Sequence, residues 1–314
     1  MLKEVSIVVP VHNEMQNVLE FVERIDLVFT GLCYNYNIIF VDDGSTDKTL
    51  GLIKKIAKSN SNVYFISLSR NFGQQSALRA GMEHAPGDCI ITMDGDLQHP
   101  PEIIANMLEK WEQGFEVVYT MREEDIKLGY FKNKSSKLFY FIMNKLSDLE
   151  MSYGEADFRL IGRRVLDIIN SLPEQNLYYR GIVKWVGFSQ VGLKYIPNER
   201  NAGESKYNFS KMIKIAIDAI TAFSIKPLTI ATYLGLIISV LSILYVPYIL
   251  YSLFKRHPIS GWTSLMFSLA FFGGLILFML GIIGIYLGKL FMQSKGRPSY
   301  IIKEMHIQCQ KQYS

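Results

Sequence analysis

Residues 89–102 read Cys89-Ile90-Ile91-Thr92-Met93-Asp94-Gly95-Asp96-Leu97-Gln98-His99-Pro100-Pro101-Glu102. An apolar run, typical of a buried strand, ends in two carboxylates one residue apart, and a Pro-Pro pair then opens a helix. Gly95 lets the chain turn between the two carboxylates. Mg²⁺ and Mn²⁺ prefer oxygen ligands, commonly one or two carboxylates together with substrate phosphates. The stretch therefore predicts a strand tip that seats a divalent cation and a diphosphate, with a plain polar turn as the alternative.

The sequence around this stretch alternates between strands and helices. Apolar runs of strand length occur at 5–11, 37–41, 63–68, 89–93 and 116–120. Segments with helical periodicity lie between them, at 14–29, 46–59, 74–83 and 101–113. This alternation is typical of right-handed crossovers in a doubly wound, mostly parallel α/β sheet. Further along, the sequence predicts a loop at 154–159 that enters a helix at 163–169, and a strand at 191–196.

Polar side chains gather where the predicted strands end. These ends read Pro10-Val11-His12-Asn13-Glu14, Asp42-Asp43-Gly44-Ser45, Ser69-Arg70-Asn71, Asp94-Gly95-Asp96 and Arg122. Open parallel sheets bind ligands at the carboxyl ends of their strands. No Gly-x-Gly-x-x-Gly follows the first strand and no Walker lysine loop is present, which argues against a dinucleotide oxidoreductase and a P-loop ATPase. Acidic strand ends suit a nucleotide-sugar, because uridine and ribose donate to carboxylates while a diphosphate needs metal and arginine.

The C-terminal third of the chain is strongly apolar. Residues 227–254 and 257–288 contain no Asp, Glu, Lys or Arg, and each stretch exceeds the roughly 20 residues that cross a bilayer. We therefore predict two transmembrane helices. Lysines and arginines lie before the first and after the second, which places both chain ends in the cytoplasm by the positive-inside rule, and the N-terminus shows no signal peptide.

A further membrane element is predicted just before the first span. Between 209 and 223 apolar residues recur every three to four positions, with lysines on the flanks. This pattern favours an amphipathic helix in the headgroup plane, with packing on the soluble domain as the alternative. The predicted organisation is a cytoplasmic catalytic domain at 1–204, the interfacial helix at 205–226, a two-helix transmembrane region at 227–291 and a cytoplasmic tail at 292–314.

Charge and cysteine content narrow the set of partners. The formal net charge of +4 fits a location beside an anionic membrane leaflet. No basic stripe interleaved with aromatic residues is present, so nucleic acid is not a predicted partner. The three cysteines are widely spaced and form no Cys-x-x-Cys motif, so they read as reduced bystanders.

Taken together, these motifs resemble family 2 glycosyltransferases of the GT-A fold. Within that family the chain is most similar to polyprenyl-phosphate glycosyltransferases, namely bactoprenol glucosyltransferases and, more distantly, dolichol-phosphate mannose synthases. The resemblance covers almost the whole chain. It is carried by Ile7–Glu14, Val41–Asp47, Arg70–Gly73, Met93–Glu102, Arg200–Tyr207 and the two apolar stretches.

The resemblance implies a reaction and a location. The reaction is inverting transfer of a sugar, with glucose favoured over N-acetylglucosamine, from a UDP-sugar to undecaprenyl or another polyprenyl phosphate. The location is the cytoplasmic face of a bacterial inner membrane, where the product would serve cell-envelope or O-antigen glycosylation. A homo-oligomer, a downstream flippase and a second glycosyltransferase are partners that the resemblance leaves open.

The resemblance also implies roles for single residues. Asp94, Asp96 and Gln98 would hold Mg²⁺ or Mn²⁺, and Asp96, Arg122 and Asp157 are the predicted catalytic residues. The predicted substrate-binding residues are Pro10, His12, Glu14, Val41, Asp42, Asp43, Asp94, Gly95, Arg122, Arg200, Ser205 and Lys206. Within this set, Arg122, Arg200 and Lys206 would hold phosphates. The family often carries Tyr where this chain has His12.

The expected chemistry bears on the role of Asp157. A lipid monophosphate has a second pKa of about 6, so it is mostly dianionic near neutral pH and already a nucleophile. We therefore expect Asp157 to position the acceptor or the sugar rather than to abstract a proton. The alternative for Asp157 is an N-cap of the helix that follows. His99 has no partner His at ligand spacing, so we expect it to be structural.

Two other functions fit parts of the sequence. A processive polysaccharide synthase would share the Asp-x-Asp motif but carries Gln-x-x-Arg-Trp, whereas this chain reads Arg180-Gly181-Ile182-Val183-Lys184-Trp185. A non-catalytic membrane nucleotide-sugar sensor or scaffold would keep the fold, but loss of Asp96 or of the Arg200 loop would be expected. Both features are present, which favours the transferase.

Overall fold

The computed structural model describes residues 2–123, 155–174, 178–198, 221, 224–254 and 261–307. The described residues form two compact units: one holds those up to 198 together with 298–307, and the other holds those from 221 to 297. The predicted phosphate-binding residues Arg200, Ser205 and Lys206 lie outside the described residues. So does the predicted amphipathic helix at 209–223, apart from Thr221.

The first unit is built on one eight-stranded sheet with the order β7-β5-β6-β4-β1-β2-β3-β8. Its strands are β1 (Glu4–Val11), β2 (Asn35–Asp42), β3 (Val63–Leu68), β4 (Cys89–Thr92), β5 (Val117–Arg122), β6 (Glu155–Gly162), β7 (Gln190–Tyr195) and β8 (Ile302–His306). β1 pairs in parallel with β2 and β4, and β2 pairs in parallel with β3. The carboxyl ends of these four strands therefore reach the same edge of the sheet, as the sequence predicts.

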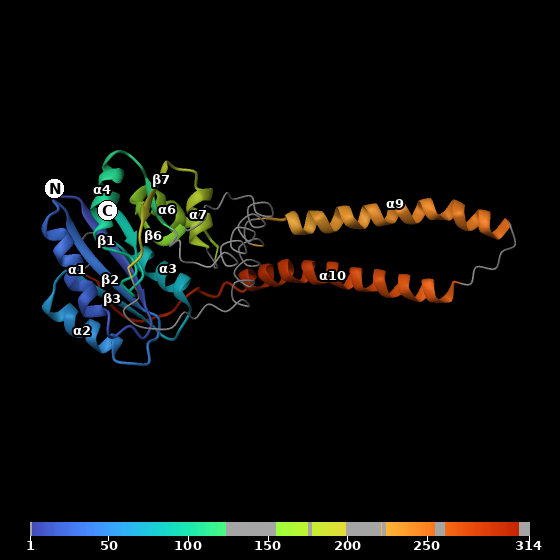
Figure 1. Ribbon diagram of the computed structural model, residues 1–314. Helices are drawn as coiled ribbons and strands as arrows, with labels where there is room; N and C mark the ends of the chain where they lie inside the picture. Colours follow the sequence, from blue (N-terminus) through green and yellow to red (C-terminus); the bar gives the residue numbers. More distant parts are fainter. Residues whose placement is uncertain are drawn as a thin grey trace. The chain divides into compact units, whose positions relative to one another are not determined.

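Helices cover both faces of this sheet (Figure 1). They are α1 (Val18–Thr30), α2 (Thr49–Ser59), α3 (Gln74–His84), α4 (Ile103–Glu112), α6 (Arg163–Ser171) and α7 (Tyr179–Trp185). Apolar residues of α1, α2 and α4 join one buried cluster with Val5, Ile7 and Val9 of β1. Side chains alternate along a strand, and on the other face α3 approaches so closely that a Cβ on Gly81 would clash with Val8 Cγ1.

The prediction of a loop at 154–159 is wrong. Residues 155–162 form β6, which runs antiparallel between β4 and β5. Because β6 runs against its neighbours, its first residues lie at the edge where β4 and β5 end. Asp157 therefore sits on a strand, and not at the N-terminus of α6, whose N-cap is Gly162.

The chain returns to the first unit after its long C-terminal helices. β8 pairs antiparallel with β3, and the Ser69 N–H donates to the Ile301 carbonyl at 2.9 Å. Lys54 of α2 forms an ion pair of 2.6 Å with Glu304. The segment predicted as a tail thus contributes an edge strand to the first unit, and the sheet has β7 and β8 as its two edges.

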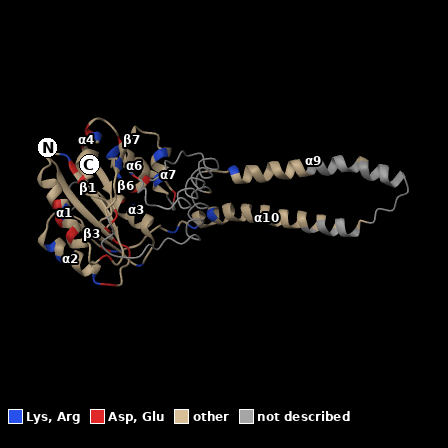
Figure 2. Ribbon diagram, viewed as in Figure 1, with Lys and Arg blue, Asp and Glu red and all other residues tan. Residues whose placement is uncertain are grey.

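The second unit contains α9 (Lys226–Phe254) and α10 (Trp262–Ser294). Neither helix contains an acidic residue, and lysine occurs in them only as Lys226 and Lys289 (Figure 2). Among the described residues, one stretch, Phe271–Ser294, is long and apolar enough to cross a membrane. The fully described part of α9, Lys226–Ile238, is shorter, so the second predicted span stays a prediction.

Candidate active site

The tips of β1 and β2 are joined through Asp43. One carboxylate oxygen of Asp43 accepts the Phe72 N–H at 2.7 Å, and the other accepts the Gly73 N–H at 2.9 Å. Its backbone N–H donates to the Val11 carbonyl at 2.9 Å, and its carbonyl accepts from His12 Nδ1 at 2.9 Å. Asp43 is only 4% exposed. This residue therefore fixes the ends of three strands, β1, β2 and β3, relative to one another.

The neighbouring turn is held by Asn13 and Asp42. Asn13 has a positive φ of 59°, and its side-chain oxygen accepts the Thr46 N–H at 2.9 Å. Asp42 is 1% exposed and accepts the Ser45 N–H at 3.2 Å and the Ser67 hydroxyl at 3.3 Å. The buried Asp42 carboxylate thus stabilises the turn from the protein interior, while His12 and Asn13 are exposed to solvent.

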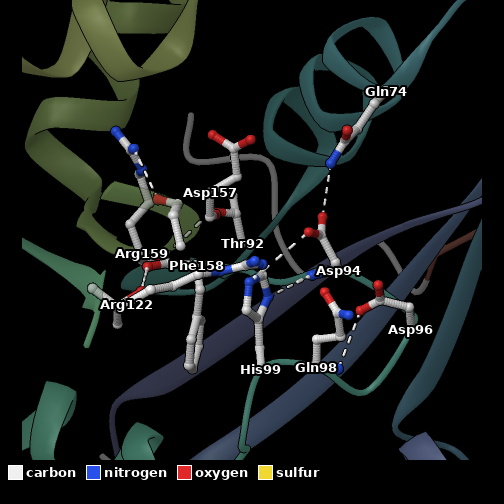
Figure 3. A network of polar contacts seen from close by, with 12 residues as sticks. Gln74, Thr92, Asp94, Asp96, Gln98, His99, Arg122, Asp157, Phe158 and Arg159 are labelled. Carbon is white, nitrogen blue, oxygen red and sulfur yellow. Dashed lines mark hydrogen bonds and ion pairs between the residues drawn. The ribbon is translucent and has the colours of Figure 1, made fainter. Parts of the chain in front are cut away.

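The tip of β4 carries the two carboxylates of the opening motif (Figure 3). Gln74, the first residue of α3, donates its side-chain amide to Asp94 Oδ1 at 2.7 Å. Asp96 Oδ1 accepts the Gln98 N–H at 3.1 Å, which closes a short turn. Within that turn Leu97 has a positive φ of 61°. The two carboxylates therefore stand on a tight turn and have different hydrogen-bond partners.

The loop after β7 docks on the same turn. Asn198 donates its backbone N–H to the Gln98 carbonyl at 3.0 Å and its side-chain amide to the Leu97 carbonyl at 3.3 Å. On the preceding strand, Tyr195 accepts from Arg122 Nε at 3.0 Å through its hydroxyl. These contacts bring the end of β7, and Arg122 from the end of β5, to the carboxylates of β4.

His99 is buried directly behind the carboxylates. Its ring stacks on Phe158 with centroids 5.2 Å apart, and its Nδ1 accepts the Asp94 N–H at 3.3 Å. Burial, followed by the charge of Arg122, lowers the pKa of His99 to about 4, so the ring is neutral and carries its proton on Nε2. This Nε2 lies 3.9 Å from Asp94 Oδ2. The geometry agrees with a structural role for His99.

Asp94 lies in an environment that disfavours its charged form. Although 31% of its side chain is exposed, burial of the strand tip raises the pKa of Asp94 to about 7, and the charges of Asp157 and Asp96 add to the rise. Arg122 and Arg180 oppose it. A carboxyl group whose pKa stands this far above its ordinary value gains from a nearby cation.

Asp157 has the opposite electrostatic environment. Arg180 of α7 donates Nε to one carboxylate oxygen and a terminal nitrogen to the other, each at 2.8 Å. Burial alone would raise the pKa of Asp157, but the charge and hydrogen bonds of Arg180 outweigh burial and hold it at about 2. Thr92 donates its hydroxyl to the Asp157 carbonyl at 2.6 Å, which ties this residue to β4.

The structure brings most of the predicted residues to one edge of the sheet. Those placed there are Pro10, His12, Glu14, Val41, Asp42, Asp43, Asp94, Gly95, Asp96, Gln98, Arg122 and Asp157. Sequence reasoning did not assign Gln74 or Arg180. Gln74 could have been found, because it opens the helix that follows a polar strand end, whereas Arg180 has no local signal that links it to Asp157.

The donors at the β4 tip fit a divalent cation of the magnesium type. Asp94, Asp96 and the Gln98 side chain all offer oxygen, the atom that Mg²⁺ and Mn²⁺ prefer. Among the described residues, no group of three or more His, Cys, Asp and Glu side chains forms an all-protein metal cage. Three oxygen donors leave positions of an octahedral Mg²⁺ shell open, which water and substrate phosphates usually fill.

Comparison with known proteins gives consistent matches. The model of the glycosyl transferase family 2 matches residues 6–169. The chain is 41% identical over 302 residues to an uncharacterized glycosyltransferase, YkcC, of Bacillus subtilis, with 96% of this chain and 94% of that protein covered. It is 39% identical over 304 residues to the SfII prophage-derived bactoprenol glucosyl transferase of Shigella flexneri, with 96% and 98% covered.

A solved structure shows the same GT-A fold. Glucosyl-3-phosphoglycerate synthase from Mycobacterium tuberculosis, in complex with Mn²⁺, UDP-glucose and phosphoglyceric acid, aligns with a TM-score of 0.50. The sequence identity is 20%, and 70% of this chain and 78% of that chain are covered.

Proposed function

This chain belongs to glycosyl transferase family 2, and we propose that it transfers a sugar, with glucose the first candidate, from a UDP-sugar to a polyprenyl phosphate at a membrane. One observation carries the proposal: similarity to a bactoprenol glucosyl transferase extends over 96% of this chain and 98% of that relative. The match therefore includes the catalytic unit and both long helices. A fold that contains only the nucleotide-binding half would not account for it.

Asp94, Asp96 and Gln98 would hold a divalent cation against the donor diphosphate. The cation would neutralise the charge that develops on the departing nucleoside diphosphate. The raised pKa of Asp94 supports this assignment, because burial and the charges of Asp157 and Asp96 disfavour its carboxylate form and a cation would favour it. Arg122, exposed at the end of β5 and oriented by Tyr195, would add a second positive charge on the phosphates.

The uridine would bind over the tips of β1 and β2. Pro10, His12, Glu14, Val41 and Asp43 are its proposed contacts, since they surround the turn that Asp43 fixes. Arg200 and Lys206 are proposed to hold phosphates, and Ser205 is proposed to contact the substrate. The docking of Asn198 on Leu97 and Gln98 supports this, because it brings the chain that leads to Arg200 beside the carboxylates of β4.

The transfer is proposed as a direct displacement with inversion at the anomeric carbon. An acceptor phosphate oxygen forms the new bond to that carbon, and the bond to the diphosphate breaks as UDP leaves with the electron pair. A lipid phosphate with a second pKa of about 6 reacts as the dianion, so no proton needs to be removed from it at neutral pH. The low pKa of Asp157 supports a positioning role, since a carboxylate with a pKa of about 2 is a weak base.

Membrane attachment is proposed to involve two spans. The chain leaves the first unit before α9 and returns to it after α10, where β8 pairs with β3. A chain whose two ends belong to one soluble unit crosses a membrane an even number of times. The candidate span Phe271–Ser294 therefore needs a partner, and α9 is the apolar helix that can supply it. The lysines that flank these helices favour a cytoplasmic catalytic unit.

The function is tested with purified full-length protein, a panel of labelled UDP-sugars, Mn²⁺ and undecaprenyl phosphate. We expect a single labelled sugar in the lipid phase and release of one UDP per transfer. Undecaprenol, which has the same lipid but no phosphate, is the matched control and should accept nothing. Formation of a long polymer would instead indicate a processive synthase, and UDP-sugar binding without turnover would indicate a sensor.

Metal binding should depend on pH through Asp94. Below pH 7 this carboxyl is protonated, so an incoming cation must displace a proton, whereas above pH 7 it does not. We expect the affinity for Mn²⁺ alone to rise by about tenfold per pH unit between pH 5.5 and 7 and then to level off. Isothermal titration calorimetry measures this, and Asp94→Asn should flatten the profile. An affinity independent of pH below 6 would contradict the assignment.

The proposed topology is tested by cysteine labelling. Cys33 is exposed in the first unit and Cys89 is buried, so a Cys309→Ser variant leaves Cys33 as the reporter. A membrane-impermeant maleimide should label Cys33 in inside-out vesicles and not in right-side-out ones. Ser260→Cys, between the two helices in the sequence, should show the reverse pattern in a Cys33→Ser/Cys309→Ser background. Labelling of both positions from the same side would exclude the two-span arrangement.

A further inference from the structure

Two ion pairs fasten α7 to the start of β6. Arg180 grips Asp157 with two hydrogen bonds of 2.8 Å, and Lys184 forms an ion pair with Glu155. The two carboxylates are strongly shielded, with side chains 14% and 3% exposed. The cations stand four residues apart on a helix, and the carboxylates stand two residues apart on a strand.

The distance between the two cations along α7 matches the distance between the two carboxylates along β6. Four residues of helix rise about 6 Å, and two residues of strand rise about 6.6 Å. Residues at i and i+4 share a helix face, and residues at i and i+2 share a strand face. Both ion pairs can therefore form at the same time where α7 lies along β6, and the helix is held to the strand at two points.

The two ion pairs differ in how they relate to the candidate site. Asp157 faces the carboxylates of β4 closely enough that its charge raises the pKa of Asp94. The other charges that act on the pKa of Asp94 are those of Asp96, Arg122 and Arg180. The main groups that act on the pKa of Asp157 are Arg180 from α7, Arg159 from β6 and His99 from the loop after β4. The Arg180 pair thus reaches the candidate site, whereas Lys184 pairs with Glu155, the first residue of β6.

The two hydrogen bonds from Arg180 leave the Asp157 carboxylate able to accept further hydrogen bonds. A carboxylate has about four acceptor positions, and a side-on guanidinium fork takes one on each oxygen. The remaining positions face away from the fork. They suit a hydroxyl group of a sugar, which donates a hydrogen bond without giving up its proton.

We propose that Arg180 is a positioning residue for sugar transfer: its two-point grip fixes the orientation of the Asp157 carboxylate, which in turn orients the sugar for attack. The inference rests on the proposed function, because it takes the reaction to be displacement at a sugar carbon. Lysine would keep the positive charge but lacks the planar, two-point donor geometry of arginine, so it can replace Arg180 only in part.

The test compares the two pairs in the full-length protein. Arg180→Gln should lower kcat by about 10- to 100-fold and leave the KM for UDP-glucose within about twofold, and Arg180→Lys should recover part of the loss. Lys184→Gln, the matched control, should lower Tm while kcat stays within about threefold. If Lys184→Gln does not fold, Glu155→Gln/Lys184→Gln removes both charges of that pair and takes its place.

A second comparison separates positioning from loss of structure. Asp157→Asn/Arg180→Gln should be no slower than Asp157→Asn alone, because the arginine acts through the carboxylate. Equal losses of kcat in the Arg180 and Lys184 variants, or additive losses in the double variant, would overturn the inference.

Hydrolysis of UDP-glucose without an acceptor tests the role of Arg180 separately from the proposed lipid-phosphate acceptor. Slow release of glucose from UDP-glucose to water should show the same selective loss in Arg180→Gln. If wild-type protein releases glucose but transfers none to undecaprenyl phosphate, the proposed acceptor is wrong while Arg180 is still tested by hydrolysis. Hydrolysis that is unchanged in Arg180→Gln would overturn the inference itself.

Discussion

Replacing Asp96 by alanine is expected to lower kcat for sugar transfer by at least about 10²-fold, the scale of losing a major electrostatic stabiliser of a transition state. Asp96 stands on the tight turn after β4, beside Asp94, whose pKa is raised by burial and further by the charges of Asp157 and Asp96. The charge on a departing UDP develops where these carboxylates would hold a cation. The measurement is steady-state transfer at saturating UDP-sugar, lipid phosphate and Mn²⁺.

The variant Asp96→Asn separates charge from shape. An asparagine oxygen can still accept the Gln98 N–H that closes the turn in the native protein at 3.1 Å, so the loop should keep its conformation. We expect most of the loss in kcat to persist in Asp96→Asn, together with weaker binding of Mn²⁺. Asp167→Ala, which removes a carboxylate 62% exposed on α6, is the control and should have no effect. Turnover of Asp96→Ala near the wild-type rate in EDTA would refute the metal assignment.

The strand ends could be predicted from the sequence because their signals are local. An apolar run that stops at Asp42-Asp43-Gly44 or at Asp94-Gly95-Asp96 carries both the strand and its ligand-facing tip within a few residues. Parallel crossovers then bring these tips to one edge without any knowledge of side-chain contacts. The predicted strand at 63–68 matches β3, and the predicted helix at 74–83 matches α3 except for one added residue.

β6 was missed although its pattern is visible. Glu155, Asp157 and Arg159 alternate with Ala156, Phe158 and Leu160, which is the period-two signal of a strand. Three charged residues on one face argue against a central strand, because buried charges are costly unless they are paired. The cations that pair with Asp157 and Glu155 lie on α7, and the sequence near residue 155 gives no signal that predicts them.

α7 and β8 depend on tertiary contacts in the same way. α7 has only 7 residues, too few for a stable isolated helix, and it is held by the two ion pairs and by buried Tyr179, Ile182 and Val183. β8 reads Ile302-Lys303-Glu304-Met305-His306, a charged sequence typical of a protected edge strand rather than of a core strand. Its pairing with β3 requires the chain to return from the second unit, which local patterns do not reveal.

Replacing Gly44 by alanine is expected to raise the KM for UDP-glucose by about 10²-fold, on the order of 3 kcal/mol. Gly44 has a positive φ of 65°, and a Cβ on it would stand 2.5 Å from the Arg70 carbonyl carbon and 2.6 Å from the Asn71 nitrogen. Both atoms are backbone, so the segment at 70–73 would have to move. That segment supplies the Phe72 and Gly73 N–H groups that hold Asp43.

Asp43 links strain at Gly44 to nucleotide binding. Hydrogen bonds to a charged group contribute about 1.5–3 kcal/mol each, and moving the segment at 70–73 would break both that Asp43 accepts. The uridine pocket proposed at the tips of β1 and β2 would then lose a fixed boundary, while Asp96, which accepts the Gln98 N–H, would keep its contact. We therefore expect kcat to change far less than KM.

The control for this prediction is Gly114→Ala. Gly114 also has a positive φ, of 96°, but nothing lies within 4 Å of the position its Cβ would take, and it follows α4 away from the strand ends. Both variants carry a left-handed alanine, so both should lose some Tm through backbone strain. Only Gly44→Ala should weaken UDP binding, which calorimetry with UDP and Mn²⁺ measures directly. If the two variants lose Tm equally and bind UDP equally well, the segment at 70–73 tolerates displacement, and Asp43 does not shape the nucleotide pocket.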